Sequence, residues 1–244
     1  MSDFDRNSSA VRGFGADRAV AIDAGLRAHM IRVYNYMAAS VAITGVVSLL
    51  VAQWLANDPA LMRTLYSGPA ALLVFLVPLG ISFFLGFRIH TMQPATARAV
   101  LFFYAASVGL MLAPIFLIYT STSIARVFFI TAAAFGGLSL YGYTTQRNLA
   151  PMGAFMMMGA IGIFIAILVN MFLKSGGLDF AISVIGVIVF AGLTAWHTQE
   201  IKEMYEPMDD GTVAGRKAVL GAWMLYADFV NMFLFLLRLF GERR

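Results

Sequence analysis

Seven long apolar stretches dominate this 244-residue chain and limit what it can fold into. Each is close to the roughly 20 residues that a helix needs to cross about 30 Å of membrane hydrocarbon. The stretches lack the alternation of polar and apolar residues typical of barrel strands, and a helix satisfies its own backbone hydrogen bonds. The sequence therefore predicts an all-α integral membrane protein with seven transmembrane helices, near residues 36–56, 68–88, 99–119, 124–143, 152–173, 178–198 and 218–240.

Composition excludes several other classes of protein. The chain is 60% hydrophobic and 12% charged, whereas a soluble domain is roughly 45–50% apolar and 25% charged. Its net charge is +4, but the basic residues are spread singly between apolar segments, so we expect no nucleic-acid partner. The absence of cysteine excludes disulfides and thiolate chemistry. With three histidines and no metalloprotease, hydrolase-elbow or P-loop motif, we expect no enzyme, no catalytic residue, no metal site and no cofactor.

The first 35 residues differ from the rest of the chain. They are polar and arginine-bearing, and they contain no apolar core of a secretory signal peptide. We expect a flexible or surface-lying cytoplasmic tail over residues 1–35, followed by a transmembrane domain over residues 36–244. With the N-terminus inside, about eleven of the 17 lysines and arginines are cytoplasmic, which favours this orientation and an external C-terminus. A re-entrant final segment would instead return the C-terminus to the inside.

A carboxylate lies in the middle of the last apolar stretch. At the centre of a membrane helix, Asp228 costs roughly 2.5 kcal/mol or more. Such a group usually faces the bundle interior or a wet cavity and has a function; the alternative is a buried acid that only fixes helix packing. Asn231, three residues later, shares its helix face, whereas Tyr226, two residues earlier, points elsewhere.

Two further ionisable residues lie at the ends of predicted spans. His197 is at the inner end of the sixth, and an imidazole and a carboxylate on adjacent helices would make a proton-responsive latch. Taken alone, His197 is better interpreted as a helix-end histidine that contacts carbonyls or headgroups. Arg88 closes the second span, where a snorkelling anchor on the positive inner side is the simpler interpretation.

Four sequence stretches together resemble a known family. They are Arg88–Ala97; Tyr141–Leu149 with Met152–Phe155; Asn170–Leu173 with the sixth span through Lys202; and Tyr226–Phe233 with Leu236–Gly241. Their order and spacing across most of residues 25–241 resemble the Bax inhibitor-1 family of membrane proteins, in its bacterial branch. Each stretch is weak evidence alone, whereas the ordered set is specific.

The resemblance implies a bacterial inner-membrane protein whose last helix is enclosed by the other six. It also implies a pH-sensitive calcium leak, with aspartates on the sixth and seventh helices as proton sensor and gate and Ca²⁺ as the transported ion. Asp228 matches the second aspartate, and Arg88 matches an arginine that could pair with the carboxylates.

The sequence departs from this pattern at one position. His197 stands where the first aspartate is expected, just before Thr198-Gln199. A pair of aspartates can share one proton between two carboxylates, whereas a histidine and an aspartate cannot. A charged imidazole also repels Ca²⁺. Glu200, one turn further along, could supply a substitute carboxylate. We therefore expect a leak that is altered or lost.

Two other function classes stay open. One is a non-transporting regulator that binds a membrane-anchored ATP-dependent protease or another membrane complex, with residues 1–30 as the binding segment. The other is a proton-coupled transporter, which predicts two repeated halves with interrupted helices. The sequence has no convincing internal repeat, so the leak and the regulator are the stronger candidates.

Overall fold

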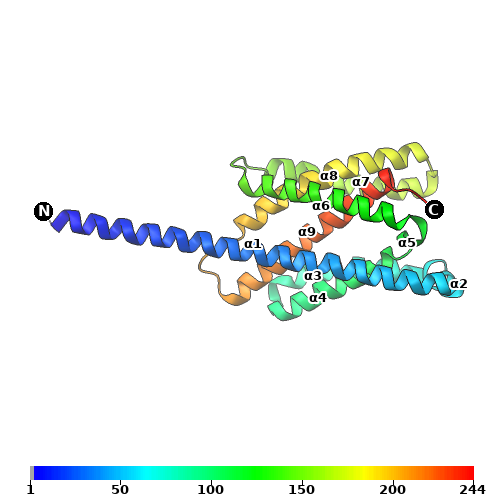
Figure 1. The fold of residues 1–244 in the computed structure, drawn as a ribbon, viewed down its shortest axis with the longest axis horizontal. Helices are drawn as coiled ribbons and strands as arrows, with labels where there is room; N and C mark the ends of the chain where they lie inside the picture. Colours follow the sequence, from blue (N-terminus) through cyan, green and yellow to red (C-terminus); the bar gives the residue numbers. More distant parts are fainter. Residues whose placement is uncertain (1–2) are drawn as a thin grey trace.

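The computed structural model describes the backbone of residues 3–244 and the side chains from residue 24 onward. In chain order it contains α1 (Asp3–Asn57), α2 (Pro59–Tyr66), α3 (Ala70–Arg88), the short 3₁₀ helix η1 (Ile89–Thr91), α4 (Pro94–Leu112), α5 (Ile115–Ile118), α6 (Ser121–Thr144), α7 (Ala150–Leu173), α8 (Gly176–Glu203) and α9 (Gly211–Phe240) (Figure 1). Within this part of the chain, seven helical segments are long and apolar enough to cross a membrane, which confirms the predicted all-α, seven-span fold.

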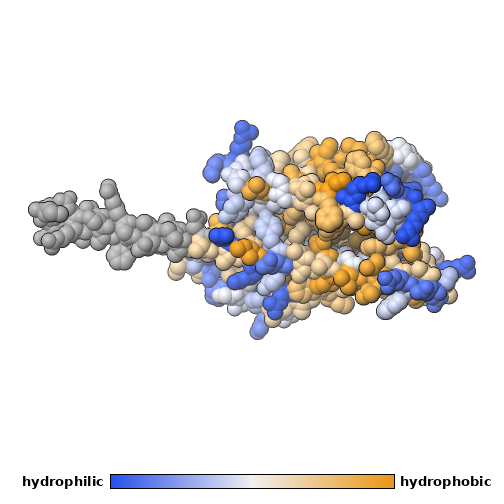
Figure 2. All heavy atoms as spheres, viewed as in Figure 1, coloured by the Kyte–Doolittle hydropathy of each residue, from blue (hydrophilic) through white to orange (hydrophobic). Residues whose placement is uncertain are grey.

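The surface of the bundle has the pattern expected of a membrane protein. On the face drawn in Figure 2, apolar side chains cover most of the middle of the bundle, and polar side chains gather toward its two ends. α9 is one continuous helix from Gly211 to Phe240, so the last segment is not re-entrant. α1 enters the bundle from the end opposite to the C-terminus (Figure 1). Which of these ends faces the cytoplasm stays a prediction.

The first helix begins well before the expected span at residues 36–56. α1 is continuous across residue 35. His29, Met30, Val33 and Met37 are buried and follow the spacing of one helix face. Polar residues lie between them on the exposed face, which is why apolar content alone placed the boundary too late. Residues 24–35 therefore pack with the bundle, whereas the side chains of the tail over residues 1–23 lie outside the described part.

The last two membrane helices also extend beyond their apolar cores. The prediction of a long loop over about 199–217 is wrong, because α8 continues to Glu203 and α9 begins at Gly211. Asp210 caps α9 by accepting hydrogen bonds from the backbone N–H groups of Thr212 and Val213. Apolar residues mark the hydrocarbon layer, but a helix continues beyond it wherever its polar side chains find partners.

α9 is the most buried membrane helix. In its most apolar stretch 61% of the residues are buried, against 11% for α7 and 17% for α3. α9 packs mainly against α1, α4, α6 and α8, whereas α3 packs on α4 and α7 packs on α8. α3 and α7 thus form an outer layer on α4 and α8. Enclosure of the last helix by all six others stays a prediction.

Candidate functional site

His197 lies inside α8 and not at its end. Since α8 continues for six residues to Glu203, His197 is more than one turn within the helix. His197 is only 7% exposed. The interpretation of His197 as a helix-end residue that contacts headgroups is therefore wrong.

His197 and Asp228 are in direct contact between α8 and α9. The His197 Nδ1 atom lies 2.6 Å from the Asp228 Oδ2 atom, within hydrogen-bonding distance. Their side chains are 8% and 2% exposed. Two ionisable groups, one from each helix, thus share one buried hydrogen bond. We call this pair the latch.

Two glycines allow α8 and α9 to approach closely on either side of the latch. A Cβ atom on Gly186 of α8 would lie 2.6 Å from the Phe235 ring of α9. On the opposite helix, a Cβ atom on Gly221 would lie 3.0 Å from the Ile201 side chain. Larger residues would push the helices apart at both points. These small residues therefore help to bring the imidazole and the carboxylate within hydrogen-bonding distance.

The polar groups next to the latch are largely satisfied locally. The Thr198 hydroxyl donates to the Thr194 carbonyl at 2.8 Å and lies 3.4 Å from the Ser139 hydroxyl on α6. The Trp196 and His197 ring centroids are 4.8 Å apart. In the searched residues, no three His, Cys, Asp or Glu side chains cluster as a metal site would require. The latch itself consists of one imidazole and one carboxylate, which share a hydrogen bond.

The other predicted site residues do not join the latch. Asn231 donates from Nδ2 to the Ala227 carbonyl of its own helix at 2.8 Å. Glu200 is half-buried, and its Oε2 atom has no hydrogen-bond partner. Arg88 is exposed at the end of α3. Within the described part of the chain, the structure brings together His197 and Asp228 from the predicted set, and it places Arg88 at the surface.

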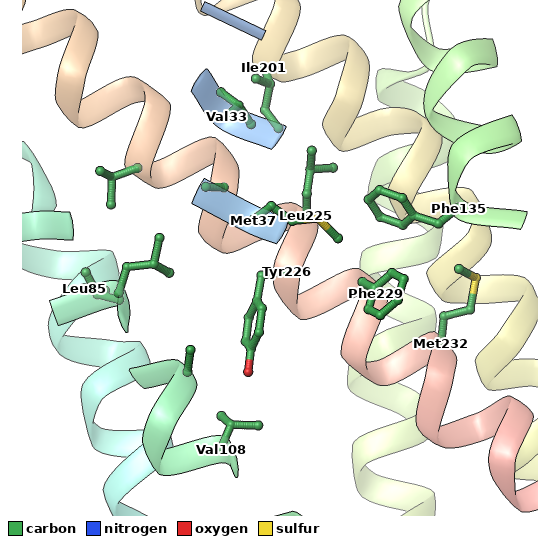
Figure 3. Packing of buried hydrophobic residues seen from close by; sticks show 14 of the residues in the cluster. Val33, Met37, Leu85, Val108, Phe135, Ile201, Leu225, Tyr226, Phe229 and Met232 are labelled. Carbon is green, nitrogen blue, oxygen red and sulfur yellow. The ribbon is translucent and has the colours of Figure 1, made fainter. Parts of the chain in front are cut away.

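A second buried polar contact on α9 was not predicted. The Tyr226 hydroxyl lies 2.6 Å from the Thr44 hydroxyl of α1, and Thr44 donates to the Ala105 carbonyl of α4 at 2.9 Å. Tyr226 projects from α9 toward the level of Val108 (Figure 3). Tyr226 contacts α1 whereas Asp228 contacts α8, which agrees with the expectation that the two residues face different neighbours. The sequence signal that could have predicted this contact is a pair of hydroxyl residues, Thr44 and Ser48, one turn apart in an apolar span. Ser48 also donates to α4, at the Gly109 carbonyl, over 2.7 Å.

Hydrogen bonds also connect the loops to α8 and α9. Gln199 accepts from the Leu149 backbone N–H and donates to the Arg147 carbonyl, both at 2.8 Å. Arg216 donates to the carbonyls of Met92 and His90, both at 2.6 Å. The α6–α7 loop is thus held by α8, and the α3–α4 turn by α9. Any movement of α8 against α9 would act on both loops.

Comparison with known proteins gives consistent matches over nearly the whole chain. The sequence profile of the family described as "Inhibitor of apoptosis-promoting Bax1" matches residues 26–244. An uncharacterized protein of Rickettsia prowazekii (strain Madrid E) is 46% identical over 224 residues, covering 91% of this chain and 92% of the relative. Inner membrane protein YbhL of Escherichia coli (strain K12) is 41% identical over 232 residues, covering 94% and 97%. An uncharacterized protein of Caulobacter vibrioides is 39% identical over 255 residues, covering all of both chains.

Proposed function

The chain belongs to the Bax inhibitor-1 family, and from this premise we propose that it is a pH-sensitive cation leak whose gate is the His197–Asp228 latch. The contact of 2.6 Å between two buried ionisable groups is the observation that carries the proposal. Calcium is the ion that the family resemblance suggests.

A single proton can change the strength of this contact. With the imidazole charged and the carboxylate ionised, the two groups form an ion pair; with one charge neutralised, only a hydrogen bond is left. The difference between these two states is larger in a buried, low-dielectric site than in water. Histidine is the side chain whose ordinary pKa lies in the physiological range. The latch therefore supplies a physical route from pH to the separation of α8 and α9.

On this proposal, the arrangement in which Asp228 is buried is the closed state. Asp228 is 2% exposed, and it lies 17 residues after the start of α9, about 26 Å along the helix axis. A cation that passes this level needs α8 and α9 to separate and water to enter. Once separated, Asp228 would attract a cation, whereas a charged His197 would repel it. We therefore expect a slow leak in place of a high-affinity calcium site.

Calcium flux into proteoliposomes tests the proposal. The purified full-length protein is measured at pH 6, 7 and 8 beside Asp228→Asn, which removes the ionisable group with little change of shape. Asp179→Asn is the matched control, because Asp179 is also on α8, but its side chain is 45% exposed and lies 3.7 Å from Arg238 of α9. We expect the wild type and the control to share one pH dependence, and Asp228→Asn to lose it.

Two results would count against this function. Flux of Asp228→Asn with an unchanged pH dependence would remove the latch from the gate. No flux above empty liposomes at any pH, with folding confirmed by circular dichroism, would remove the leak itself. That second result would favour the non-transporting regulator, for which loss of an effect on a membrane protease after deletion of residues 1–30 is the next test.

A further inference from the structure

An apolar groove lies between α1 and α6. Its larger cavity measures about 1310 Å³ and extends along α1 from Ala24 to Val46, with the facing wall formed by α6 and the floor by Phe229 of α9. A smaller cavity of about 310 Å³ shares Val41, Gly45 and Phe128 with it and continues to Ser48. From Ala24 to Ser48 the groove spans about 36 Å, close to a full membrane thickness.

The groove is open because small residues line both of its walls. Ala38, Ala42 and Gly45 lie on α1, opposite Ala132 and Gly136 on α6. A Cβ atom added to either glycine would have no neighbouring atom within 4 Å. Space is therefore left between α1 and α6 at these two glycines, and the apolar walls of the groove are accessible to lipid.

One end of the groove is basic. Arg27 lines the larger cavity at the same end as Tyr34 and Tyr143. The Lys202 amine lies 5.2 Å from the Tyr143 ring centroid and donates to the Tyr143 carbonyl at 2.9 Å. Among the described residues that line the two cavities, none is Asp or Glu. A guanidinium at the mouth of an otherwise apolar groove is complementary to a phosphate attached to a hydrocarbon chain.

We propose that this groove binds a membrane phospholipid, with the phosphate beside Arg27 and one acyl chain along the floor toward Phe128. The distance from Arg27 to Gly45, which faces Phe128, is 18 residues or about 27 Å along α1. Half of a bilayer, headgroups included, is about 20–22 Å thick. An acyl chain whose phosphate lies beside Arg27 therefore runs toward Phe128 and ends about 5–7 Å before its level.

A phospholipid fits the groove better than a transmembrane helix does. A helix offers no charge for Arg27 unless it carries an acid at that level, whereas every phospholipid carries a phosphate. The charge at the mouth of the groove therefore favours the lipid.

Photo-crosslinking in vesicles tests the site. The probe is phosphatidylglycerol with a diazirine at the end of one acyl chain, at low mole fraction in phosphatidylcholine vesicles that contain the full-length protein. Crosslinks are mapped by mass spectrometry at Phe128, Phe135 and Phe229 of the groove. They are normalised to crosslinks at Phe172, which is 87% exposed on α7 and reports ordinary surface lipid. We expect the groove to be labelled well above Phe172.

Two matched pairs of variants identify the cause of the labelling. Arg27→Gln removes the guanidinium and is compared with Arg32→Gln, an exposed arginine on the same helix that does not line the groove. Gly136→Trp fills the groove and is compared with Gly137→Trp, where the added side chain also meets open space outside it. We expect Arg27→Gln to lower the normalised groove labelling about tenfold, as the loss of a charged hydrogen bond predicts. We expect Gly136→Trp to lower it by occupying the groove, and each control to leave it unchanged.

A diacylglycerol probe with the same diazirine chain separates the phosphate from the chain. It should label the wild-type groove about tenfold less than the phospholipid does, and Arg27→Gln should not lower that labelling further. Arg27 is exposed, so its variant should fold even if Gly136→Trp does not.

Three results would overturn the proposal. One is groove labelling no higher than at Phe172 in the wild type. Another is groove labelling that neither Arg27→Gln nor a folded Gly136→Trp lowers. The third is a stable dimer that Gly136→Trp dissociates while lipid labelling stays absent, which would assign the groove to a second copy of the chain.

Discussion

The two sides of α9 are fastened to the bundle by different chemistry. Toward α8, Asp228 meets His197 at 2.6 Å, and both groups can gain or lose a proton. Toward α1 and α4, Tyr226 meets Thr44 at the same distance, and the hydroxyl chain ends on the Ala105 carbonyl. The two residues of α9 are two positions apart and are 2% and 1% exposed. The two contacts are alike in burial and in distance, so they differ only in the type of group: ionisable groups toward α8 and neutral hydroxyls toward α1 and α4.

On the proposed function, this difference separates a contact that would respond to pH from one that would not. A chain of neutral hydroxyls keeps its strength through the physiological range, since no member titrates there under ordinary conditions. A carboxylate and an imidazole change their attraction whenever one proton is gained or lost. On the proposed function, α9 would stay attached to α1 and α4 while the strength of its contact with α8 varies.

The largest expected effect comes from removing the carboxylate. Asp228→Ala leaves the buried imidazole without its partner, and we expect the free energy of unfolding to fall by about 3 kcal/mol. The measurement is SDS-induced unfolding of the purified protein, followed by circular dichroism at pH 7. A loss below about 1 kcal/mol, the value of an ordinary hydrogen bond, would mean that the latch is no stronger than the Tyr226 contact.

Replacing the imidazole by a second carboxylate should change the response to pH. In His197→Asp the two acids titrate as a coupled pair, and we expect the midpoint of the calcium-flux profile to move by about one pH unit or more. His90→Asp is the control, because it makes the same chemical change at an exposed position in η1. An unchanged midpoint in His197→Asp would exclude position 197 from the gate.

A smaller effect is expected on the neutral side of α9. Tyr226→Phe keeps the ring and removes the hydroxyl, so the Thr44 contact is lost while Thr44 still donates to Ala105. We expect the unfolding free energy to fall by about 1 kcal/mol. The pH profile of the flux should stay where it is in the wild type. A shift of that profile would show that the two sides of α9 are not independent.

The smallest effect is expected at Arg88. The side chain is exposed at the end of α3, so Arg88→Gln should change the unfolding free energy by less than about 0.5 kcal/mol. It should also leave the pH midpoint of the flux unchanged. If Arg88→Gln alters that midpoint as strongly as His197→Asp does, the arginine pairs with the latch in another state of the protein.

The sequence predicted the number and type of the membrane helices because burial in lipid imposes a strong and local requirement. Each span must be long, apolar and self-satisfied in hydrogen bonds. The same criterion placed helix ends poorly, as at residues 35 and 199–217, because polar residues continue a helix outside the hydrocarbon. It singled out Asp228 correctly as buried, since no lipid-facing position tolerates such a charge well.

What the sequence by itself determined was therefore the membrane, the seven spans and the buried acid. Only the tertiary structure decided what that acid contacts: His197, 31 positions away, through a register of α8 on α9 that is set by the close packing at Gly186 and Gly221. It also decided that Tyr226 binds Thr44 and that α1 and α6 leave a groove between them. The physical reason is that hydropathy acts residue by residue along the chain, whereas a hydrogen bond between helices depends on their rotation and separation. Those are set by packing across the whole bundle.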